Sequence, residues 1–345
     1  MNYYLGIDLG GTNTKLGILD DEGKTLGKGS VPTHIQDGPQ AACIRIAGGV
    51  ERLLAEVGVS RDKIVSAGLA SAGTMDIPGR RLMIPANLGP LWNYCPICDM
   101  MADACGVPVI FANDASAAAF AEFWVGKGKT ATKTILAGEG FEKTTQPIDS
   151  MILLTLGTGI GCGIVLDRMV YDGAHSHAGE YGHSIIDYHA DARVCGCGKP
   201  GHFEAYASAT ALIARAREAV ASGAETTLAK RLDDLTEFGA KVVAEEAEKG
   251  DSVAMDLVIE TAKYLAVGIT TLMHTIDPDA IFIGGAMIFG GNANPLGRAF
   301  LQAIRDEVSI RAYRACSMTT TLDFAELGGD AGFIGAAGIA KFTKK

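Results

Sequence analysis

The sequence has few positive charges, few prolines and modest overall charge. Its 345 residues contain 30 Lys and Arg against 40 Asp and Glu, which gives a net charge of −10. Because nucleic acids are bound by clustered cations, this balance argues against a nucleic-acid partner. Proline numbers only 11, so no collagenous or low-complexity segment is expected. With 48% apolar and 20% charged residues, the chain is expected to be globular.

Long apolar runs are also missing, and no secretory leader is expected. One of the longest uncharged stretches, residues 150–166, contains four glycines, which a membrane-spanning helix would tolerate poorly. No basic segment precedes Asp8, so the first residues predict a strand and no secretory signal. Most of the 8 cysteines are scattered, which favours reduced thiols over a disulfide framework. We therefore expect a soluble, cytoplasmic protein with no membrane partner.

What is present begins with a repeat. Residues 5–20 and residues 152–167 each contain an apolar run, a Gly/Thr turn, a second apolar run and a closing Asp. At roughly 150 residues per domain, a chain of 345 residues favours two domains. A duplicated hairpin that opens two similar domains is the simplest interpretation.

The rest of the chain alternates between helical and strand patterns. The expected elements are helices over residues 39–57, 115–124 and 257–276, and strands over residues 64–70, 107–111 and 281–285. Residues 130–149 are polar and predict a surface excursion. Residues 328–337 are rich in Gly and Ala and predict a small-residue helix that packs closely on another element.

The turn of the first hairpin, Asp8-Leu9-Gly10-Gly11-Thr12, has the composition of a phosphate-binding turn. Glycines let backbone N–H groups approach an anion, and Thr12 adds a hydroxyl donor. Asp8, at the end of the predicted strand, is placed to hold Mg²⁺ through water. A simple Gly-rich hairpin explains this motif equally well. The second copy, Gly157-Thr158-Gly159, favours two turns that clamp the phosphates of a nucleotide.

Asn113 and Asp114 stand at a predicted strand-to-helix junction. Such a carboxylate can accept a proton from a substrate hydroxyl while Asn113 hydrogen-bonds a neighbouring hydroxyl. An ordinary helix N-cap also explains the pair.

Two imidazoles and two thiols are grouped in the middle of the chain. They are His183, Cys195, Cys197 and His202. This donor set suits a tetrahedral Zn²⁺ site with no open position, which would be structural. Such a site would fix the loop so that Glu180 and Glu204 point toward a polyol. The alternative is a reduced cysteine pair beside surface histidines.

Together these motifs resemble the ROK family of bacterial sugar kinases, particularly its glucokinases, within the actin/hexokinase/Hsp70 superfamily. The resemblance covers nearly the whole chain and follows the family order at residues 8–12, 113–114, 156–161, 179–183, 195–204 and 283–285. It implies a duplicated actin-like (ribonuclease H-like) α/β fold with two domains around a cleft. The implied domains are residues 1–114 with residues 328–345, and residues 115–327, which carry the zinc loop and the insertion at 130–149.

The resemblance also implies residue roles. The ATP and Mg²⁺ contacts would be Asp8, Gly10, Gly11, Thr12, Asn13, Gly157, Thr158, Gly159, Gly284 and Gly285. The sugar contacts would be Gly73, Asn87, Asn113, Asp114, Glu180, His183 and Glu204. Asp114 would be the base on the 6-hydroxyl of the sugar. The chain departs from the family at His202, where a third cysteine is usual.

The activity implied by this resemblance is the ATP-dependent phosphorylation of a hexose, with D-glucose to glucose 6-phosphate as the expected glycolytic reaction. The alternative to glucose is another hexose, such as N-acetylmannosamine, mannose, fructose or allose, and polyphosphate is an alternative donor. The family also includes sugar-sensing regulatory proteins, which carry a helix-turn-helix before the first strand, whereas this chain enters its first predicted strand by residue 3. A homodimer or homotetramer is expected, as is common in the family.

Overall fold

The computed structural model describes residues 2–85, 87–137, 140–232 and 238–343. It divides into two compact units. The first consists of Met1–Thr130, Gly163–Gly179 and Glu326–Lys345, and the second of Ala131–Cys162 and Glu180–Ala325. The domain boundaries expected from the sequence, at residues 114 and 328, are a different division, because the segments after Asp114 and after Cys162 pack with the first unit. The domain organisation expected from the sequence is not tested by this division and stays a prediction.

The first unit contains a five-stranded sheet with the order β3-β2-β1-β4-β7. Its strands are β1 (Tyr3–Leu9), β2 (Asn13–Asp20), β3 (Thr25–Pro32), β4 (Ile64–Ser71) and β7 (Val109–Asn113). β1, β2 and β3 form antiparallel pairs, and β1, β4 and β7 are parallel. The carboxyl ends of β1 and β7 therefore lie at the same edge, and these ends carry Asp8 and Asn113.

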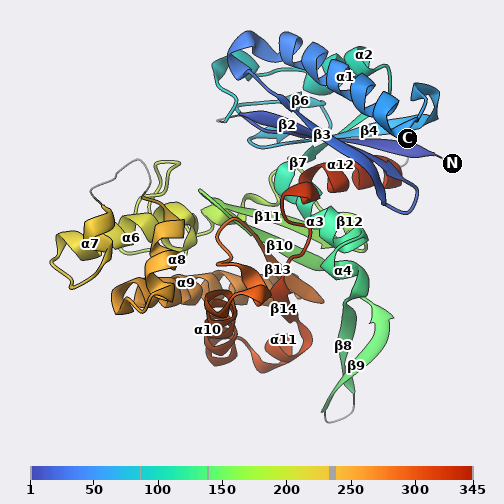
Figure 1. The fold of residues 1–345 in the computed structure, drawn as a ribbon. Coiled ribbons are helices and arrows are strands. Elements are labelled where there is room, and N and C mark those ends of the chain that lie inside the picture. The colour runs from blue at the N-terminus through green and yellow to red at the C-terminus, as the bar shows by residue number, and fades with distance from the viewer. Residues whose placement is uncertain (1, 86, 138–139, 233–237, 344–345) are drawn as a thin grey trace. The chain divides into compact units, whose positions relative to one another are not determined.

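Helices cover both faces of this sheet. α1 (Gly38–Val57) and α2 (Ile97–Cys105) lie on one face, and α12 (Ala331–Phe342) lies on the other, as Figure 1 shows. The α1 side buries a large apolar core that includes Leu5, Ile46 and Leu53. Two-stranded β5 (Met75–Asp76) and β6 (Arg81–Leu82) lie in the loop before α2. The expected amphipathic helix over residues 39–57 is confirmed as α1.

α12 packs so closely on its neighbours that glycine is required at several of the contacts. A Cβ on Gly68 of β4 would lie 1.8 Å from the carbonyl oxygen of Ala336, and a Cβ on Gly335 would lie 1.6 Å from that of Ala117 in α3 (Asp114–Trp124). Side-chain atoms do not approach backbone this closely. The expected small-residue helix near the C-terminus is thereby confirmed, and its main packing partners are α3, β1 and β4.

The second five-stranded sheet repeats the order of the first, as β12-β11-β10-β13-β14. Its strands are β10 (Met151–Leu156), β11 (Ile160–Leu166), β12 (Met169–Val170), β13 (Ala280–Gly285) and β14 (Thr321–Phe324). β10, β13 and β14 are parallel, as β1, β4 and β7 are. The duplicated hairpin expected from the sequence is therefore confirmed as β1–β2 and β10–β11.

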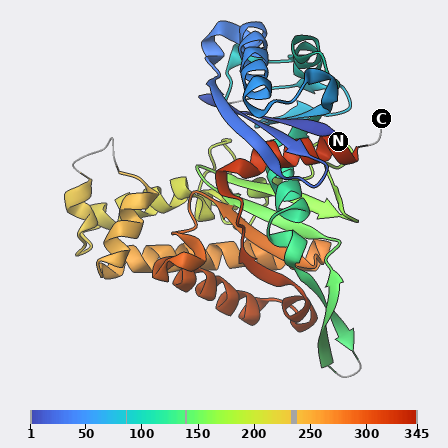
Figure 2. The same cartoon turned by 45° about the vertical axis from the view of Figure 1, so that its right-hand side comes forward.

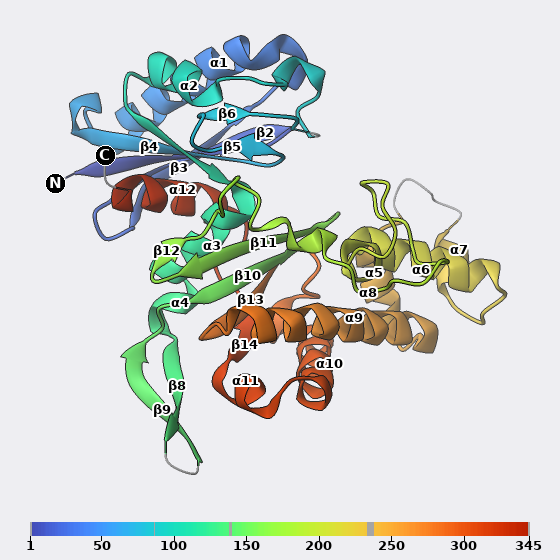
Figure 3. The same ribbon diagram turned by 180° about the vertical axis from the view of Figure 1, so that it is seen from behind.

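The helices of the second unit are α5 (Glu204–Ala207), α6 (Ala209–Ala221), α7 (Leu228–Arg231), α8 (Ala240–Glu248), α9 (Ser252–Ile276), α10 (Pro295–Arg311) and α11 (Arg314–Thr319). α9 and α10 lie side by side, with α9 below β13 in the view of Figure 3. Among the described residues, no helix joins the length and the apolar character that crossing a bilayer requires.

The polar segment at residues 130–149 forms a β-hairpin. After the short helix α4 (Lys127–Thr130), β8 (Thr132–Ala137) and β9 (Gly140–Pro147) pair with each other and with no strand of the two larger sheets. The hairpin extends away from the helices and sheet of the second unit (Figures 1 and 2). In the described residues, the expected surface excursion is thus a β-hairpin; Gly138 and Glu139 lie outside the described residues.

A buried carboxylate ties α3 to the chain that leads into α12. Glu122 is 1% exposed and accepts hydrogen bonds from the backbone nitrogens of Lys127, Glu326 and Leu327 at 2.9, 2.9 and 2.7 Å. We expect Glu122→Ala to lower the free energy of unfolding by about 3 kcal/mol, because three backbone N–H groups lose a buried, charged acceptor. Urea denaturation measures this loss. Glu56→Ala, an exposed position of α1, should change stability by less than about 0.5 kcal/mol, and equal losses in both variants would contradict the assignment.

Candidate functional site

Asp8 is the first functional candidate that the structure places. It lies near the end of β1, and its carboxylate sits against Gly332 at the start of α12, where a Cβ would be 2.5 Å from Oδ2. Burial and the nearby Asp114 carboxylate raise the pKa of Asp8 to about 6, while Lys15 opposes this rise. Asp8 and Asp114, more than a hundred positions apart in sequence, thus lie close enough to repel each other. A divalent cation bound beside these two carboxylates would reduce their mutual repulsion.

Asn113 and Asp114 lie where β7 meets α3. β7 runs from Val109 to Asn113 rather than over residues 107–111, because Pro108 has no N–H to continue the strand pairing. The Asn113 side chain caps α3 by accepting hydrogen bonds from the backbone nitrogens of Ala115 and Ser116 at 2.9 and 3.2 Å. The N-cap interpretation is therefore confirmed for Asn113. Asp114 is the first residue of α3, and its role in proton transfer stays a prediction.

The Gly-rich turn of the first hairpin lies beside the loop that carries Asn87. A Cβ on Gly11 would lie 2.7 Å from the backbone oxygen of Asn87, and one on Gly10 would lie 2.7 Å from the backbone oxygen of Asn13. Asn13 and Asn87 are both exposed, as is Thr12. The structure thus brings the predicted phosphate turn and a predicted sugar contact together within the first unit.

Gly73 lies at the beginning of the segment that leads to Asn87. Its φ of +97° is in the range that favours glycine, and a Cβ there would lie 2.7 Å from the Cα of Pro85. Gly73 therefore lets two stretches of backbone meet, and the predicted sugar contact at this position stays a prediction.

The sequence analysis missed Lys15. In the β1–β2 pairing Lys15 stands directly opposite Asp8, so the two side chains share one face of the sheet. Its Nζ donates to the carbonyl oxygen of Gly329 at 2.5 Å, in the turn that precedes α12. The pairing of Lys15 with Asp8 could have been predicted from the strand pattern of residues 13–20, because residues that face each other in a tight hairpin can be counted from the turn.

In the second unit, the turn at Gly157-Thr158-Gly159 is closed by backbone and side-chain hydrogen bonds. The nitrogen of Gly157 donates to the carbonyl oxygen of Gly159 at 3.0 Å, and Thr210 Oγ1 donates to that of Thr158 at 2.8 Å. Glu204 Oε2 accepts from the nitrogen of Ile160 at 3.0 Å. The turn is thus fixed from α5 and α6, with Thr158 exposed.

The four predicted metal ligands come together in space. The ligand atoms of His183, Cys195, Cys197 and His202 all lie within 4.8 Å of one another. Sγ of Cys195 is 3.7 Å from Nδ1 of His183, and Sγ of Cys197 is 3.2 Å from Nδ1 of His202. Zn–S and Zn–N bonds of about 2.3 and 2.0 Å in a tetrahedron put neighbouring ligand atoms about 3.5 Å apart. The described residues therefore fit a four-coordinate Zn²⁺ ion.

Two predicted sugar contacts adjoin this cluster. Oε2 of Glu180 lies 3.7 Å from Nε2 of His183, the ring nitrogen that faces away from Cys195. On the other side, Cys195 Sγ lies 3.4 Å from Oε1 of Glu204. The metal cluster thus contacts Glu180 through His183 and Glu204 through Cys195. Glu204 also accepts the hydrogen bond from the second Gly/Thr turn. The contacts of Glu180 and Glu204 to a sugar stay predictions.

Gly284 and Gly285 end β13, and a cavity begins beside them. Gly285 has a φ of +92° and lies against the backbone of Leu156, so a side chain there would clash. The cavity has a volume of about 260 Å³ and lies between the residues after β13, such as Met287 and Phe289, and the helix α8. Sequence analysis named the two glycines but not the cavity, whose α8 wall comes from residues more than 30 positions away.

With this geometry described, comparison with known proteins identifies the family. Residues 4–140 and 137–343 match the model of the ROK family. The glucokinase of Halalkalibacterium halodurans is 31% identical over 339 residues, which cover 98% of this chain and 95% of that protein. The N-acetylmannosamine kinase of Salmonella paratyphi B is 28% identical over 98% of both chains.

A solved structure extends the comparison to the fold. The ROK family glucokinase from Streptomyces griseus, in complex with glucose and AMPPNP, is 27% identical, with a TM-score of 0.73 over 99% of this chain and 100% of that one. The predicted duplicated α/β fold of the actin-like ATPase class is thereby confirmed. The family match covers both hairpins, the Asn113–Asp114 junction and the Cys/His cluster. This chain therefore belongs to the ROK family.

Proposed function

We propose that this chain is an ATP-dependent hexose kinase whose substrate is D-glucose. The observation that supports it most strongly is the proximity of Asp8, near the end of β1, to Asp114, the first residue of α3, within the first unit. Phosphoryl transfer depends on positioning and charge neutralisation more than on covalent chemistry. A pair with one carboxylate for a cation and one for a hydroxyl meets that requirement without a nucleophilic residue.

The two carboxylates would have different roles in phosphoryl transfer. Asp114 would accept the proton of the attacking 6-hydroxyl, since a base must stand within hydrogen-bond reach of the proton it removes. Asp8 would hold Mg²⁺, which when bound neutralises the charge of the phosphates. Burial and, to a lesser extent, the nearby Asp114 carboxylate raise the pKa of Asp8 to about 6, and this supports the assignment because a bound cation would favour the charged carboxylate.

The nucleotide contacts follow the duplicated fold. Each Gly/Thr turn, residues 10–13 in the first unit and residues 157–159 in the second, would offer N–H and hydroxyl donors to phosphate groups. The cavity beside Gly284 and Gly285 would take the nucleoside, because it joins an apolar lining with a few polar side chains. The Cys/His cluster would hold a structural Zn²⁺ ion that fixes the loop from residue 180 to residue 204.

Glucose is favoured over other hexoses because the relative from Halalkalibacterium halodurans is a glucokinase. The set of predicted sugar contacts also favours glucose; it includes Asn87, Asn113, Glu180, His183 and Glu204. N-Acetylmannosamine is the second candidate, because a kinase for that sugar is 28% identical over 98% of the chain. One hydroxyl changes only one or two hydrogen bonds, so the specificity must be measured.

The experiment is an ADP-release assay with Mg-ATP and separate glucose, mannose, fructose, allose and N-acetylmannosamine. The proposal expects glucose to give the highest kcat/KM and the sugar-free blank to stay near zero. Highest turnover with N-acetylmannosamine would replace the proposed substrate and keep the kinase. Release equal to the blank with every sugar would contradict the kinase itself.

Lys15 provides a test of the phosphate contacts. We expect Lys15→Met to lower kcat/KM for ATP by about 10- to 100-fold and to leave the KM for sugar nearly unchanged, because a cation beside Asp8 is lost where phosphate charge must be neutralised. Lys28→Met is the matched control, since Lys28 Nζ contacts Asp330 in the same turn before α12. Comparable losses in both variants would assign Lys15 to the stability of that turn instead.

A further inference from the structure

Two aromatic side chains of the loop from residue 180 to residue 204 meet at one glycine of α9. Tyr181 donates its hydroxyl to the carbonyl oxygen of Gly268 at 2.7 Å. The ring of Phe203 lies against the same glycine, and a Cβ on Gly268 would be 2.5 Å from Cζ of Phe203. The Tyr181 and Phe203 rings pack edge to face, with their centroids 5.7 Å apart. We call these three residues the Gly268 contact.

The Gly268 contact leaves no room for a larger residue on α9. Phe203 is fully buried, and Gly268 is buried within α9. A side-chain carbon at position 268 would approach the ring more closely than nonbonded carbons do, so the ring would have to shift. A carbonyl oxygen has two lone pairs, so that of Gly268 can accept from Tyr181 without losing a helical bond. α9 therefore offers the loop a close-fitting support.

The Gly268 contact lies next to both predicted sugar contacts of this loop. Tyr181 follows Glu180 directly in the chain, and Phe203 directly precedes Glu204. The two stretches are joined by a hydrogen bond of 2.8 Å from the nitrogen of Phe203 to the carbonyl oxygen of Ser184. A displacement of either ring therefore displaces backbone that carries a carboxylate.

Glu180 and Glu204 differ in how else they are held. Glu204 has an anchor of its own, since its Oε2 accepts from the nitrogen of Ile160 at 3.0 Å. Glu180 is exposed, and its Oε2 lies 3.7 Å from Nε2 of His183, which is too long for a hydrogen bond. The position of Glu180 thus depends on its backbone, and Tyr181 fixes that backbone to α9.

Substrate hydrogen bonds require groups held to within about 0.5 Å, and regular elements hold them more precisely than loops do. We propose that Tyr181 and Phe203 are positioning residues, which use Gly268 as a common support to fix Glu180 and Glu204 for the sugar. The metal cluster and α9 then hold the same loop at separate points. This inference rests on the proposed function, in which the two carboxylates bind a hexose.

Gly268→Ala tests the packing in the Gly268 contact. Alanine favours a helix more than glycine does, so the substitution does not weaken α9 itself. The KM for glucose, or for the best sugar of the ADP-release panel, should rise about tenfold or more because the displaced ring carries Glu204 with it, while the KM for ATP changes by less than about twofold. Gly48→Ala, on α1, is the matched control, since the nearest atom to a Cβ there is 3.7 Å away. It should change neither KM.

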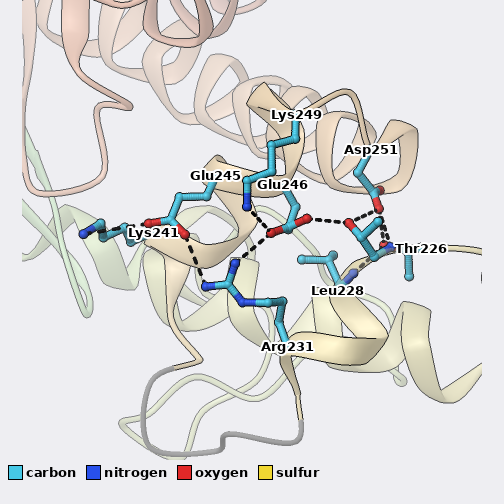
Figure 4. Close-up of polar contacts among 9 residues, drawn as sticks. Thr226, Leu228, Arg231, Lys241, Glu245, Glu246, Lys249 and Asp251 are labelled. Atoms are coloured by element: carbon cyan, nitrogen blue, oxygen red, sulfur yellow. Dashed lines mark hydrogen bonds and ion pairs between the residues drawn. The ribbon is translucent and has the colours of Figure 1, made fainter.

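Tyr181→Phe tests the hydrogen bond alone, because it keeps the ring. The KM for the same sugar should rise about fivefold, as expected for the loss of one hydrogen bond, with kcat and the KM for ATP nearly unchanged. Thr226→Val is the control, because it also removes one hydroxyl, which donates to Asp251, the N-cap of α9, at 2.8 Å. Figure 4 shows that this contact belongs to a separate network around α7 and α8. The control should leave the KM for sugar unchanged.

Zinc content separates support by α9 from support by the metal. Measured by elemental analysis, it should stay at the wild-type value in Gly268→Ala and Tyr181→Phe. An unchanged KM for sugar in both variants would overturn the inference and leave the proposed function standing. Equal rises in the KM for sugar and for ATP, an equal rise in Thr226→Val, or a rise that only accompanies loss of zinc would overturn the positioning role. A wild type without sugar-dependent ADP release would overturn the proposed function and this inference with it.

Discussion

Asp114→Asn is expected to lower kcat by about 1,000-fold, within the range of about 10² to 10⁴ for loss of a general base. The amide keeps the size of the carboxylate and the start of α3, but it cannot take the proton of the attacking hydroxyl. Sugar affinity should change by less than about fivefold, because hydrogen bonding to the amide replaces hydrogen bonding to the carboxylate. Steady-state ADP release and calorimetric titration with glucose measure the two quantities.

Asp172→Asn is the control for this variant. Asp172 is a second acid beside α3, where it accepts a hydrogen bond from Ser116 Oγ at 3.2 Å, and burial raises its pKa. An amide oxygen can accept that same bond, so turnover should stay near that of the wild type. Turnover of Asp114→Asn above about a tenth of the wild-type rate, or an equal loss in Asp172→Asn, would remove Asp114 from the role of base.

Loss of the metal site is expected to have the second large effect. Structural Zn²⁺ binds with about 10–16 kcal/mol from four ligands, or about 3 kcal/mol for each ligand. Cys197→Ser should therefore weaken Zn²⁺ binding by about 100-fold. As purified, the wild type should hold about one zinc per chain and the variant much less, and the melting temperature of the variant should fall by about 5 °C or more. Elemental analysis and thermal denaturation provide the two readouts.

Cys316, which lies outside the cluster, provides the control for the metal site. Cys316→Ser changes a partly exposed free thiol on α11, away from the cluster, and should keep both zinc and melting temperature. A chelator should reproduce the Cys197→Ser result in the wild type. Wild-type protein that holds no zinc after purification in zinc-containing buffer would contradict the metal site. Zinc content equal in both serine variants would contradict the role of Cys197.

Several parts of the site could be predicted because they are local in sequence. The two Gly/Thr turns follow from their own residues, and the Asn113 cap follows from a strand that meets a helix. The Cys/His cluster spans residues 183–202, so a single loop brings its ligands together. In each case the chain needs only neighbouring residues to form the feature, and a motif records it directly.

Other parts could not be predicted because they join distant segments. Gly332 lies against Asp8 only because α12 packs on the first sheet, and the α8 wall of the cavity meets Met287 only through the packing of the second unit. Tyr181 and Gly268 lie far apart in the chain, and Phe203 meets both of them. No spacing in the sequence relates these residues.

The sequence by itself determined the duplicated hairpins, the α/β class and the chemistry of the motifs, because hydrophobic periodicity and turn residues act over a few positions. Only the tertiary structure decided that Asp8 and Asp114 repel each other, that Lys15 faces Asp8 and that Phe203 is buried against Gly268. Such effects depend on the distance between charges and on burial, and both are set by the packing of whole elements.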